Sequence, residues 1–529
     1  MNKRSKRNSL VLIAASMLIV IAHASVAQTK KINGTVKLGG ITIDQSYGSL
    51  AAVQETYNIY EGFNFRQLLV NGFLGPKHYF TLNLRNVNLD SRKGDFLYRS
   101  PGKFRFNSNY RENRYVFDPD ASSTSFRKRW GFNLEYKPVK SFNLLGNYNF
   151  NKRTGERVSY PPGITDSWLG TGYDYLQQNF GVEGQWVGGR RGGAVRYDFT
   201  DFNNQLDDLT DRRGQVVSAR FNSPCYFYDK WMHHFRFAYG KQDVVNADVN
   251  YTLINFQYNG IIRPVQWFRF KYNLYANRID DSSTEMVTDD IQNNFSADYY
   301  YPYGRIFGGY GYEINDDDQF LTDYNTYLVG GTFDYHRRVY AKVSYANRAK
   351  NDQEKLTLLQ DIETERTLAK LKLTVMKELV IGGGYVEGER TYPDIGASAK
   401  GQWTNTYLDY KLPVWFSIRG DYSYRVEEHN NLTGTFDTNT HIMTTKVTFD
   451  RIRDLYLGAG ATYLRVKEDL DIEKSILFFE AAYTLARAYH FEVKYDVFNY
   501  DDYIVTERYY TGNIVWFNVA YDFNVNFPE

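Results

Sequence analysis

A strict two-residue alternation of apolar and polar side chains constrains this chain more than any other feature of its sequence. The alternation is clearest in residues 267–281, WFRFKYNLYANRIDD. Successive side chains of an extended strand point to opposite faces, so Phe268, Phe270 and Tyr272 share one face while Arg269 and Lys271 share the other. The pattern predicts a ribbon with one apolar face, which lies either against a protein core or against lipid.

The alternating strand recurs along the chain, each time directly after a short turn. The turns lie near Pro264, Tyr303, Arg337, Lys377, Pro413, Arg453 and Ala488. The strands that follow have similar sequences, in which an apolar start leads to a tyrosine, as in FRFKYNLYAN, IFGGYGYEIN and FSIRGDYSYR. Polar, acidic segments at 277–293, 314–325 and 426–440 are expected to be the longer loops at the other end. Strand pairs with short turns at one end and longer loops at the other are typical of transmembrane β-barrels.

The first 27 residues are expected to be removed before the chain folds. Basic residues near the start, the apolar run LVLIAASMLIVIA at 10–22 and the small residues around Ala27 predict a secretory signal peptide at 1–27. Residues 28–529 then form a single domain. This domain has one cysteine, Cys225, and no apolar run near the roughly 18 residues that a membrane-spanning helix needs. A large periplasmic protein and an outer-membrane barrel both fit these facts, and the hairpin repeat favours the barrel.

The number of turns predicts the number of strands. Five further turns lie near 75–78, 100–103, 137–140, 187–193 and 224–230. With the seven named above they make twelve, and twelve turns join thirteen hairpins. The expected fold is an all-β, antiparallel, up-and-down transmembrane barrel of about 26 strands (24–28) in the outer membrane of a Gram-negative bacterium. The strand INGTVKLGGITI (32–43) begins so early that no plug domain is expected.

The two faces of the predicted strands give two sets of candidate residues. The polar face lies in a wet lumen, and its charged candidates are Arg269, Lys271, Lys342, Arg419 and Lys494. The apolar face lies against outer-membrane lipid and ends in tyrosines that suit an aromatic girdle: Tyr310, Tyr345, Tyr385, Tyr422 and Tyr495. The alternative for these tyrosines is the ordinary preference of tyrosine for strands.

Motifs that would carry chemistry are few. Covalent haem attachment needs Cys-x-x-Cys-His, whereas Cys225 precedes Tyr-Phe-Tyr, so this chain is expected to bind no haem itself. The neighbours His233 and His234 point to opposite faces of a strand and make a poor metal site. The run Asp316–Asp318 is either a weak calcium site or, more simply, a solvated loop. No nucleophile–base pair or phosphate loop is visible, which predicts no enzyme activity, no cofactor and no metal. The balance of 63 basic and 61 acidic residues predicts no nucleic-acid partner.

The N-terminal hairpins carry a family resemblance. The segments YNIYEGFNFRQLLVNGFLGPKHYFTLNLRNVNLD (57–90) and GKFRFNSNYRENRYVFDPDA (102–121) are similar to the opening hairpins of the MtrB/PioB family of outer-membrane proteins. The chain is shorter than some members and lacks their N-terminal Cys-x-x-Cys pair. The resemblance implies a sheath around a multihaem c-type cytochrome, which carries electrons across the outer membrane while the haem stays in the partner. The alternative is a general diffusion porin or substrate channel that its own loops gate.

Overall fold

The structure is a computed structural model, and it describes most of the chain after the predicted signal peptide. The described ranges are 30–48, 61–74, 77–116, 124–158, 170–189, 191–206, 210–224, 231–247, 249–317, 320–353, 361–412, 416–431, 434–504 and 509–527. The predicted signal peptide (1–27), Cys225 and Asp318 lie outside these ranges.

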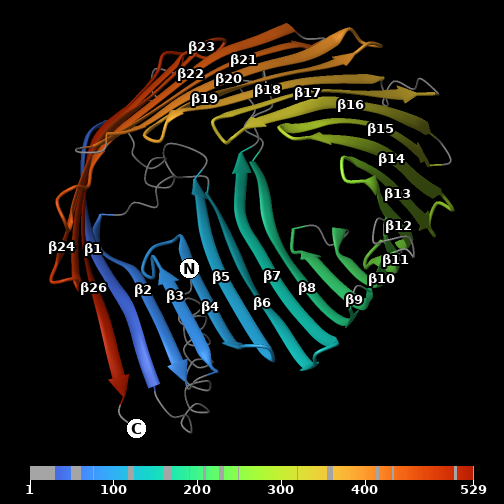
Figure 1. Cartoon of the computed structure of the whole chain (residues 1–529), viewed down its shortest axis with the longest axis horizontal. Coiled ribbons are helices and arrows are strands. Elements are labelled where there is room, and N and C mark those ends of the chain that lie inside the picture. Colours follow the sequence, from blue (N-terminus) through green and yellow to red (C-terminus); the bar gives the residue numbers. More distant parts are fainter. Residues whose placement is uncertain are drawn as a thin grey trace.

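The described residues form 26 strands of one antiparallel sheet, in agreement with the predicted count (Figure 1). The strands are β1 (Lys30–Gly48), β2 (Gly62–Leu74), β3 (Tyr79–Arg85), β4 (Arg92–Ser100), β5 (Phe104–Val116), β6 (Thr124–Val139), β7 (Phe142–Val158), β8 (Gly170–Gly188), β9 (Arg191–Asn204), β10 (Arg212–Pro224), β11 (Trp231–Val244), β12 (Val249–Val265), β13 (Phe268–Asp281), β14 (Val287–Tyr301), β15 (Gly304–Asp316), β16 (Leu321–Tyr335), β17 (Val339–Asp352), β18 (Ile362–Met376), β19 (Leu379–Tyr392), β20 (Ala397–Lys411), β21 (Ser417–Asn431), β22 (Gly434–Phe449), β23 (Leu455–Glu468), β24 (Ile472–Leu485), β25 (Tyr489–Asp502) and β26 (Tyr510–Phe527).

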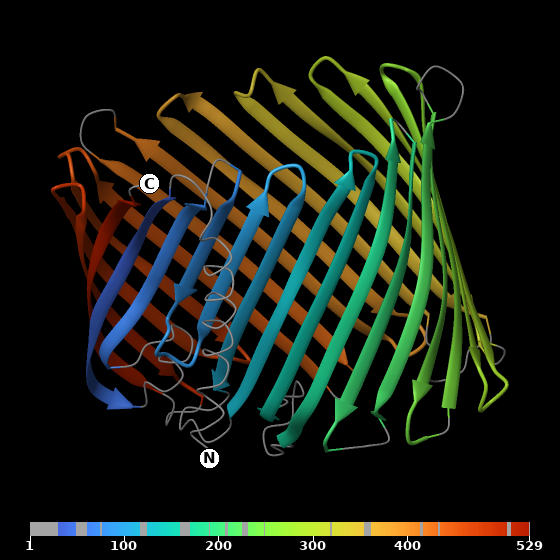
Figure 2. The ribbon, with the colours of Figure 1, turned by 90° about the horizontal axis from the view of Figure 1, so that it is seen from below.

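Each strand pairs with its neighbours in sequence, and the first strand pairs with the last. The β1–β26 pairing is antiparallel and runs from Lys30 opposite Phe527 to Gly48 opposite Tyr510. The sheet therefore closes into a barrel and leaves no free edge, which is the condition for a β-structure to cross a bilayer. The strands are inclined to the barrel axis (Figure 2). At a strand spacing of ~4.8 Å and a tilt of ~40°, 26 strands close to a backbone diameter of roughly 50 Å.

The described short turns fall where the sequence predicts them, but the loops opposite them are shorter than expected. Residues 225–230 and 413–415 of the predicted turns lie outside the described ranges. The turn after Pro264, for example, occupies only 266–267, and the turn near Arg337 is made by residues with positive φ, 48° at His336 and 60° at Arg337. The segment 277–293 is not one long loop, because β13 continues to Asp281 and β14 begins at Val287. The segments 314–325 and 426–440 likewise lie mostly within strands. The polar ends of these strands pair beyond the membrane, where no apolar face marks them as strand.

The apolar side chains point outward and the polar ones inward. Val343, Phe295 and Ile306 are about half exposed at 58%, 49% and 54%, as expected for side chains that face lipid. The one hydrophobic cluster of buried residues in the described ranges contains Ile41, Phe498, Tyr510 and Ile514, on the inner face where β25, β26 and β1 meet. The described residues therefore form no central apolar core, and their packing lies in the wall.

The described residues contain no helix long and apolar enough to span a membrane. Every regular element described is a strand of the wall. The expected absence of a plug domain concerns the whole chain and stays a prediction.

Candidate functional site: the lumen wall

The polar face of the segment that opens the sequence analysis carries a buried ion cluster. On β13, Arg269 donates from Nε to Oδ2 of Asp298 at 2.7 Å, and Lys271 Nζ lies 3.7 Å from the same oxygen. Arg305 of β15 approaches Oδ1 of Asp298 at 3.3 Å. Asp298 of β14 is only 4% exposed. Three cations from two flanking strands thus surround one buried carboxylate, so this part of the lumen wall is net positive.

The positive charge continues across the next strands. Lys342 of β17 lies directly opposite Lys370 of β18, and Lys372 follows two residues later on the same face of β18. Like charges directly opposite each other destabilise a strand pair. We define Arg269, Lys271, Arg305, Lys342, Lys370 and Lys372 as the basic band; it spans β13 to β18 on the inner face. Arg269, Lys271 and Lys342 were predicted from the sequence, whereas Arg305, Lys370 and Lys372 were not, although the same alternation marks them.

The other two predicted lumen residues lie in different environments. Arg419 of β21 pairs with Asp421 of its own strand at 2.9 Å, and its side chain is 65% exposed. Lys494 of β25 pairs with Asp496 at 2.9 Å, and the Asp496 side chain is only 2% exposed. Asp496 also accepts a 2.9 Å hydrogen bond from Nε1 of Trp516. Arg419 is therefore a solvated charge, whereas Lys494 compensates a buried one.

A second buried carboxylate lies on β8, and it was not predicted from the sequence. Glu183 of β8 is 6% exposed and pairs with Arg220 of β10 and, at 3.5 Å, with Arg196 of β9. Arg196 also holds Asp198 at 2.6 Å and donates to Oδ1 of Asn147 at 2.9 Å. No local motif predicts this cluster, because its members come from four strands.

Two rows of carboxamides also line the lumen wall. Asn107 faces Asn133, which faces Asn147 across β5, β6 and β7. Asn259, Asn273 and Asn294 form a similar row across β12, β13 and β14. Carboxamides donate and accept hydrogen bonds without carrying charge. These rows are polar but uncharged, which suits a polar solvent or a folded protein surface better than an apolar ligand.

The predicted girdle tyrosines lie on the outer face near the middle of their strands, so their role as an aromatic girdle stays a prediction. Tyr310, Tyr345, Tyr422 and Tyr495 are between 36% and 42% exposed, and Tyr385 is half-buried. Three hydroxyls reach polar partners: Tyr310 donates to Asn325, Tyr385 donates to Glu387, and Tyr422 contacts Nδ1 of His441. An aromatic ring in lipid with its hydroxyl on a polar group is the arrangement of an interfacial girdle.

A second aromatic belt, which the sequence analysis missed, lies on the outer face at the short-turn end. Its exposed members are Trp186, Trp267, Tyr299, Tyr303, Tyr335, Tyr483, Tyr489 and Tyr521. Their common signal is an aromatic residue within or close to a turn. The histidine pair divides between the two faces as its spacing implies: His233 packs against Phe235 and Tyr258 on the outer face, and His234 contacts Asn222 on the inner face.

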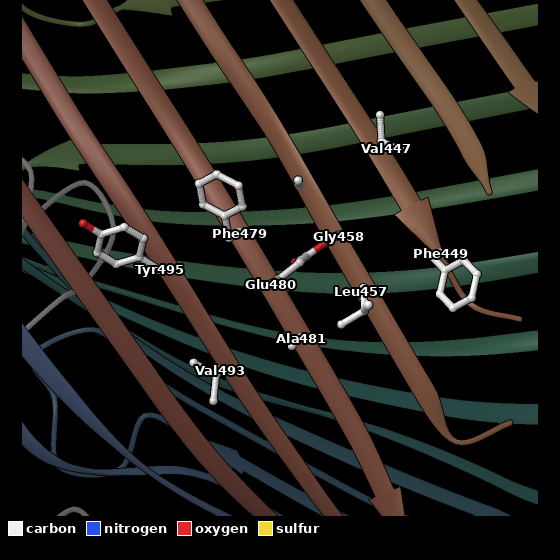
Figure 3. A pocket seen from close by; sticks show the side chains of 10 residues that line it. Val447, Phe449, Leu457, Gly458, Phe479, Glu480, Ala481, Val493 and Tyr495 are labelled. Atoms are coloured by element: carbon white, nitrogen blue, oxygen red, sulfur yellow. The ribbon is translucent and has the colours of Figure 1, made fainter. Parts of the chain in front are cut away.

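A shallow apolar depression of about 470 Å³ lies on the outer wall between β22 and β25 (Figure 3). Val447, Phe479, Val493 and Tyr495 line it (Figure 3). Glu480 also contributes to the lining, although its carboxylate lies on the inner face, where it pairs with Lys446 at 2.5 Å. The depression lies in the lipid-facing surface and holds no group that could catalyse a reaction.

The two ends of the barrel carry opposite charge. Among the described residues that connect strands at the short-turn end, nine are basic and three acidic: Lys77, Lys103, Lys140, Arg337, Arg338, Lys377, Arg451, Arg453 and Arg487 against Glu378, Asp450 and Asp454. The described connections at the loop end contain nine acidic residues and no basic one: Glu61, Asp90, Asp211, Glu285, Asp317, Asp361, Asp394, Asp469 and Asp471. The short-turn end faces the periplasm in barrels of this kind. The outer mouth is therefore acidic and the inner mouth basic.

No group of three or more His, Cys, Asp or Glu side chains is placed to hold a metal ion in the part of the chain that the structure describes. The buried carboxylates Asp298, Glu183 and Asp496 are each paired with cations instead. The absence of a metal or cofactor in the whole chain stays a prediction.

Comparison with known proteins supports the fold and its location. No family model matches the chain, and no curated protein matches its sequence. Among solved structures, a mutant of the ferric enterobactin receptor of Pseudomonas aeruginosa is similar over 94% of this chain and 81% of its own, with a TM-score of 0.53 and 8% identity. The siderophore receptor PirA of the same organism covers the same shares with a TM-score of 0.48 and 9% identity. At such identities the likeness concerns the fold alone. With the closed sheet and its apolar outer face, it identifies an outer-membrane β-barrel.

Proposed function

We propose that this barrel is a sheath that houses a multihaem c-type cytochrome and supports electron transfer across the outer membrane. The observation that carries the proposal is a closed ring of 26 strands whose described inner face is largely polar, apart from the apolar cluster near the seam. Side chains projecting inward from a ring roughly 50 Å across still leave a lumen on the order of 30 Å wide, far wider than a small solute needs. A folded polar protein fills such a space, and the resemblance to the MtrB/PioB family supports a cytochrome as that protein.

The chemistry of the lumen wall supports a protein occupant. Non-obligate protein interfaces use many dispersed hydrogen bonds, bridging water molecules and complementary charges. The carboxamide rows supply the hydrogen bonds, and the basic band supplies a positive surface for an acidic face of the occupant. In this arrangement the chain itself provides no redox centre. The barrel separates the partner from the lipid and holds the partner across the membrane.

The second candidate is a channel for a solute, with the lumen narrowed by the chain's own loops. The likeness to receptors of ferric siderophores favours this alternative, although it concerns the fold alone. The two functions differ in what closes the lumen: a second protein in one case, this chain in the other.

Conductance of the purified barrel separates the two functions. If a partner normally fills the lumen, the barrel alone in a planar bilayer conducts at a high level with weak ion selectivity, and assembly with the cognate cytochrome abolishes that conductance. Extraction of the native complex in mild detergent, followed by a haem stain, identifies the occupant. Small, strongly selective channels from the barrel alone, together with no co-eluting haem, would favour the solute channel.

A further inference from the structure

The seam where the barrel closes contains a cationic pocket on its inner face. Here β26, β1, β2 and β3 lie side by side (Figure 1). The pocket has a volume of about 360 Å³ and is lined by Lys37, Arg66, Gln67, Arg85, Trp516 and Asn518. The three cations of this lining only donate hydrogen bonds, and its two carboxamides donate and accept. Donors therefore outnumber acceptors in the pocket.

A β-bulge places Arg66 in this pocket. The β1–β2 register shifts between Lys37 and Leu38, so Lys37 faces Gln67 while Leu38 faces Phe65, and Arg66 is the additional residue. The backbone around it is held in place, because the carbonyl of Arg66 accepts a 2.9 Å hydrogen bond from the amide of Asn86. On β1, Gly39 leaves the space that the pocket needs: a Cβ there would lie 2.3 Å from Oδ1 of Asn518.

The guanidinium of Arg66 is oriented but unpaired. Its Cζ lies 4.5 Å from the centroid of the Trp516 ring, whose Nε1 donates to Asp496. Nε and Nη2 of Arg66 are buried and have no hydrogen-bond partner. Those two nitrogens form the edge of the guanidinium that binds a carboxylate with two parallel hydrogen bonds. A buried donor without a partner is costly, and more so when it is charged.

The nearest acids are already engaged. Glu492 pairs with Lys37 at 2.5 Å and accepts a 3.5 Å hydrogen bond from Asn518. Asp496 pairs with Lys494 and Trp516. Glu492 also lies close enough to interact electrostatically with Arg66. Arg66 and Arg85 nevertheless form no hydrogen bond or ion pair with a described carboxylate in this pocket.

We propose that this pocket binds a carboxylate, held by the Nε–Nη2 edge of Arg66 and by Arg85, with Gln67 as an additional donor. Rotation of the Arg66 side chain into the space that it lines turns this edge toward the ligand, while Trp516 limits the orientations that the guanidinium can take. The carboxylate comes either from a small free acid in the lumen or from an acidic side chain of the protein that occupies the lumen. The site belongs to this chain and does not depend on which protein that is.

Titration calorimetry of the detergent-solubilised barrel with citrate, at constant ionic strength, tests the free acid. The barrel is expected to bind citrate, and Arg66→Gln is expected to weaken the affinity at least tenfold. Arg66→Lys keeps the charge but loses the two-nitrogen edge, so it is expected to weaken citrate binding as well. This variant tests the geometry of the guanidinium even if Arg66→Gln folds poorly. Arg236→Gln, on the inner face of β11, is the matched control and is expected to leave citrate binding unchanged.

The second source is tested by the yield of partner protein that co-purifies with each variant. If the parent barrel binds no citrate, a tenfold loss of co-purified protein in Arg66→Gln but not in Arg236→Gln assigns the carboxylate to the partner. Equal citrate affinity in the parent and Arg66→Gln would overturn the proposal, as would no citrate binding together with equal partner yield. Absence of haem from every preparation would contradict the cytochrome and leave the citrate result standing.

Discussion

The effect of a substitution on the stability of this barrel depends on the face on which the side chain lies. Val493 is 43% exposed on the outer face of β25, next to Lys494 on the inner face. A charge on the lipid side has no water and no partner, whereas a charge on the lumen side has both. The face of a residue therefore decides the effect of a substitution more than its position along the strand.

Val493→Arg is expected to destabilise the barrel by ~2–4 kcal/mol, because it places a charge in hydrocarbon near the midplane. The matched change on the inner face is Arg419→Ser, which removes an exposed ion pair and is expected to cost about 0–1 kcal/mol. Urea unfolding of the barrel in vesicles measures both. Equal losses from the two variants would mean that both faces are buried, as in a soluble sandwich.

The buried carboxylates give the second prediction for single residues. Asp298→Ala leaves Arg269, Lys271 and Arg305 together without their common counter-ion, and we expect a loss of roughly 2–4 kcal/mol, which is moderated by the partial exposure of the three cations. Asp421→Ala, which leaves only exposed Arg419, is the control and is expected to cost under ~1 kcal/mol. The same urea titration decides, and a loss no larger in Asp298→Ala than in its control would contradict a structural role for the cluster.

Among the elements, the closing strand β1 bears a severe steric constraint. It pairs with β2 on one side and β26 on the other. Gly34 lies within this strand, where a Cβ would stand 2.0 Å from the carbonyl oxygen of Leu69 and 2.7 Å from the ring of Phe523. Gly40 lies on the same face, with nothing within 4 Å of a Cβ. The two glycines therefore separate steric fit from the general effect of a larger residue in the strand.

Gly34→Val is expected to hinder closure of the barrel, because overpacking against the backbone of β2 costs roughly 1–3 kcal/mol or more. Gly40→Val is expected to close normally. Closed barrels migrate differently on gels before and after boiling, so the fraction of heat-modifiable protein measures closure. A normal fraction in Gly34→Val would show that β1 can shift away from β2 without opening the seam.

At the scale of the whole molecule, the opposite charges of the two mouths are the dominant electrostatic feature. The acidic outer mouth attracts cations and the basic inner mouth attracts anions, over distances that salt screens. Neither mouth is visible in the balance of 63 basic and 61 acidic residues, because a total count does not show where along the barrel the charges lie.

The partner-free barrel is therefore expected to pass asymmetric current at low salt. With the protein inserted in one orientation, currents at equal positive and negative voltages should differ in 10 mM KCl, where charges act over ~30 Å, and become equal in 1 M KCl, where they act over ~3 Å. Symmetric currents at both salt concentrations would contradict a functional charge difference between the mouths. A difference that persists in 1 M KCl would indicate a moving loop instead.

Much of this fold is determined by local sequence. The side-chain period of a strand is two whatever the strand pairs with, so the lipid face of β13, the inward direction of Arg269 and the turns all follow from the chain alone. Counting turns then yields 26 strands, because an up-and-down barrel alternates turns and loops. The predicted loop lengths were wrong for a related reason. No apolar face marks the polar ends of the strands, so paired polar segments such as 277–281 resemble loops in the sequence.

The candidate sites, in contrast, depend on which strands meet and in which register. Asp298 meets Arg269 and Arg305 only through the pairing of three strands, and Glu183 meets Arg220 across an intervening strand. Arg66 reaches Trp516, 450 residues away in sequence, because the sheet closes and a bulge shifts one register by a residue. The sequence by itself thus determined the strands, their faces and their number, since these follow from backbone geometry. The tertiary structure decided which charges are buried together, since lateral register and closure join residues that no local pattern relates.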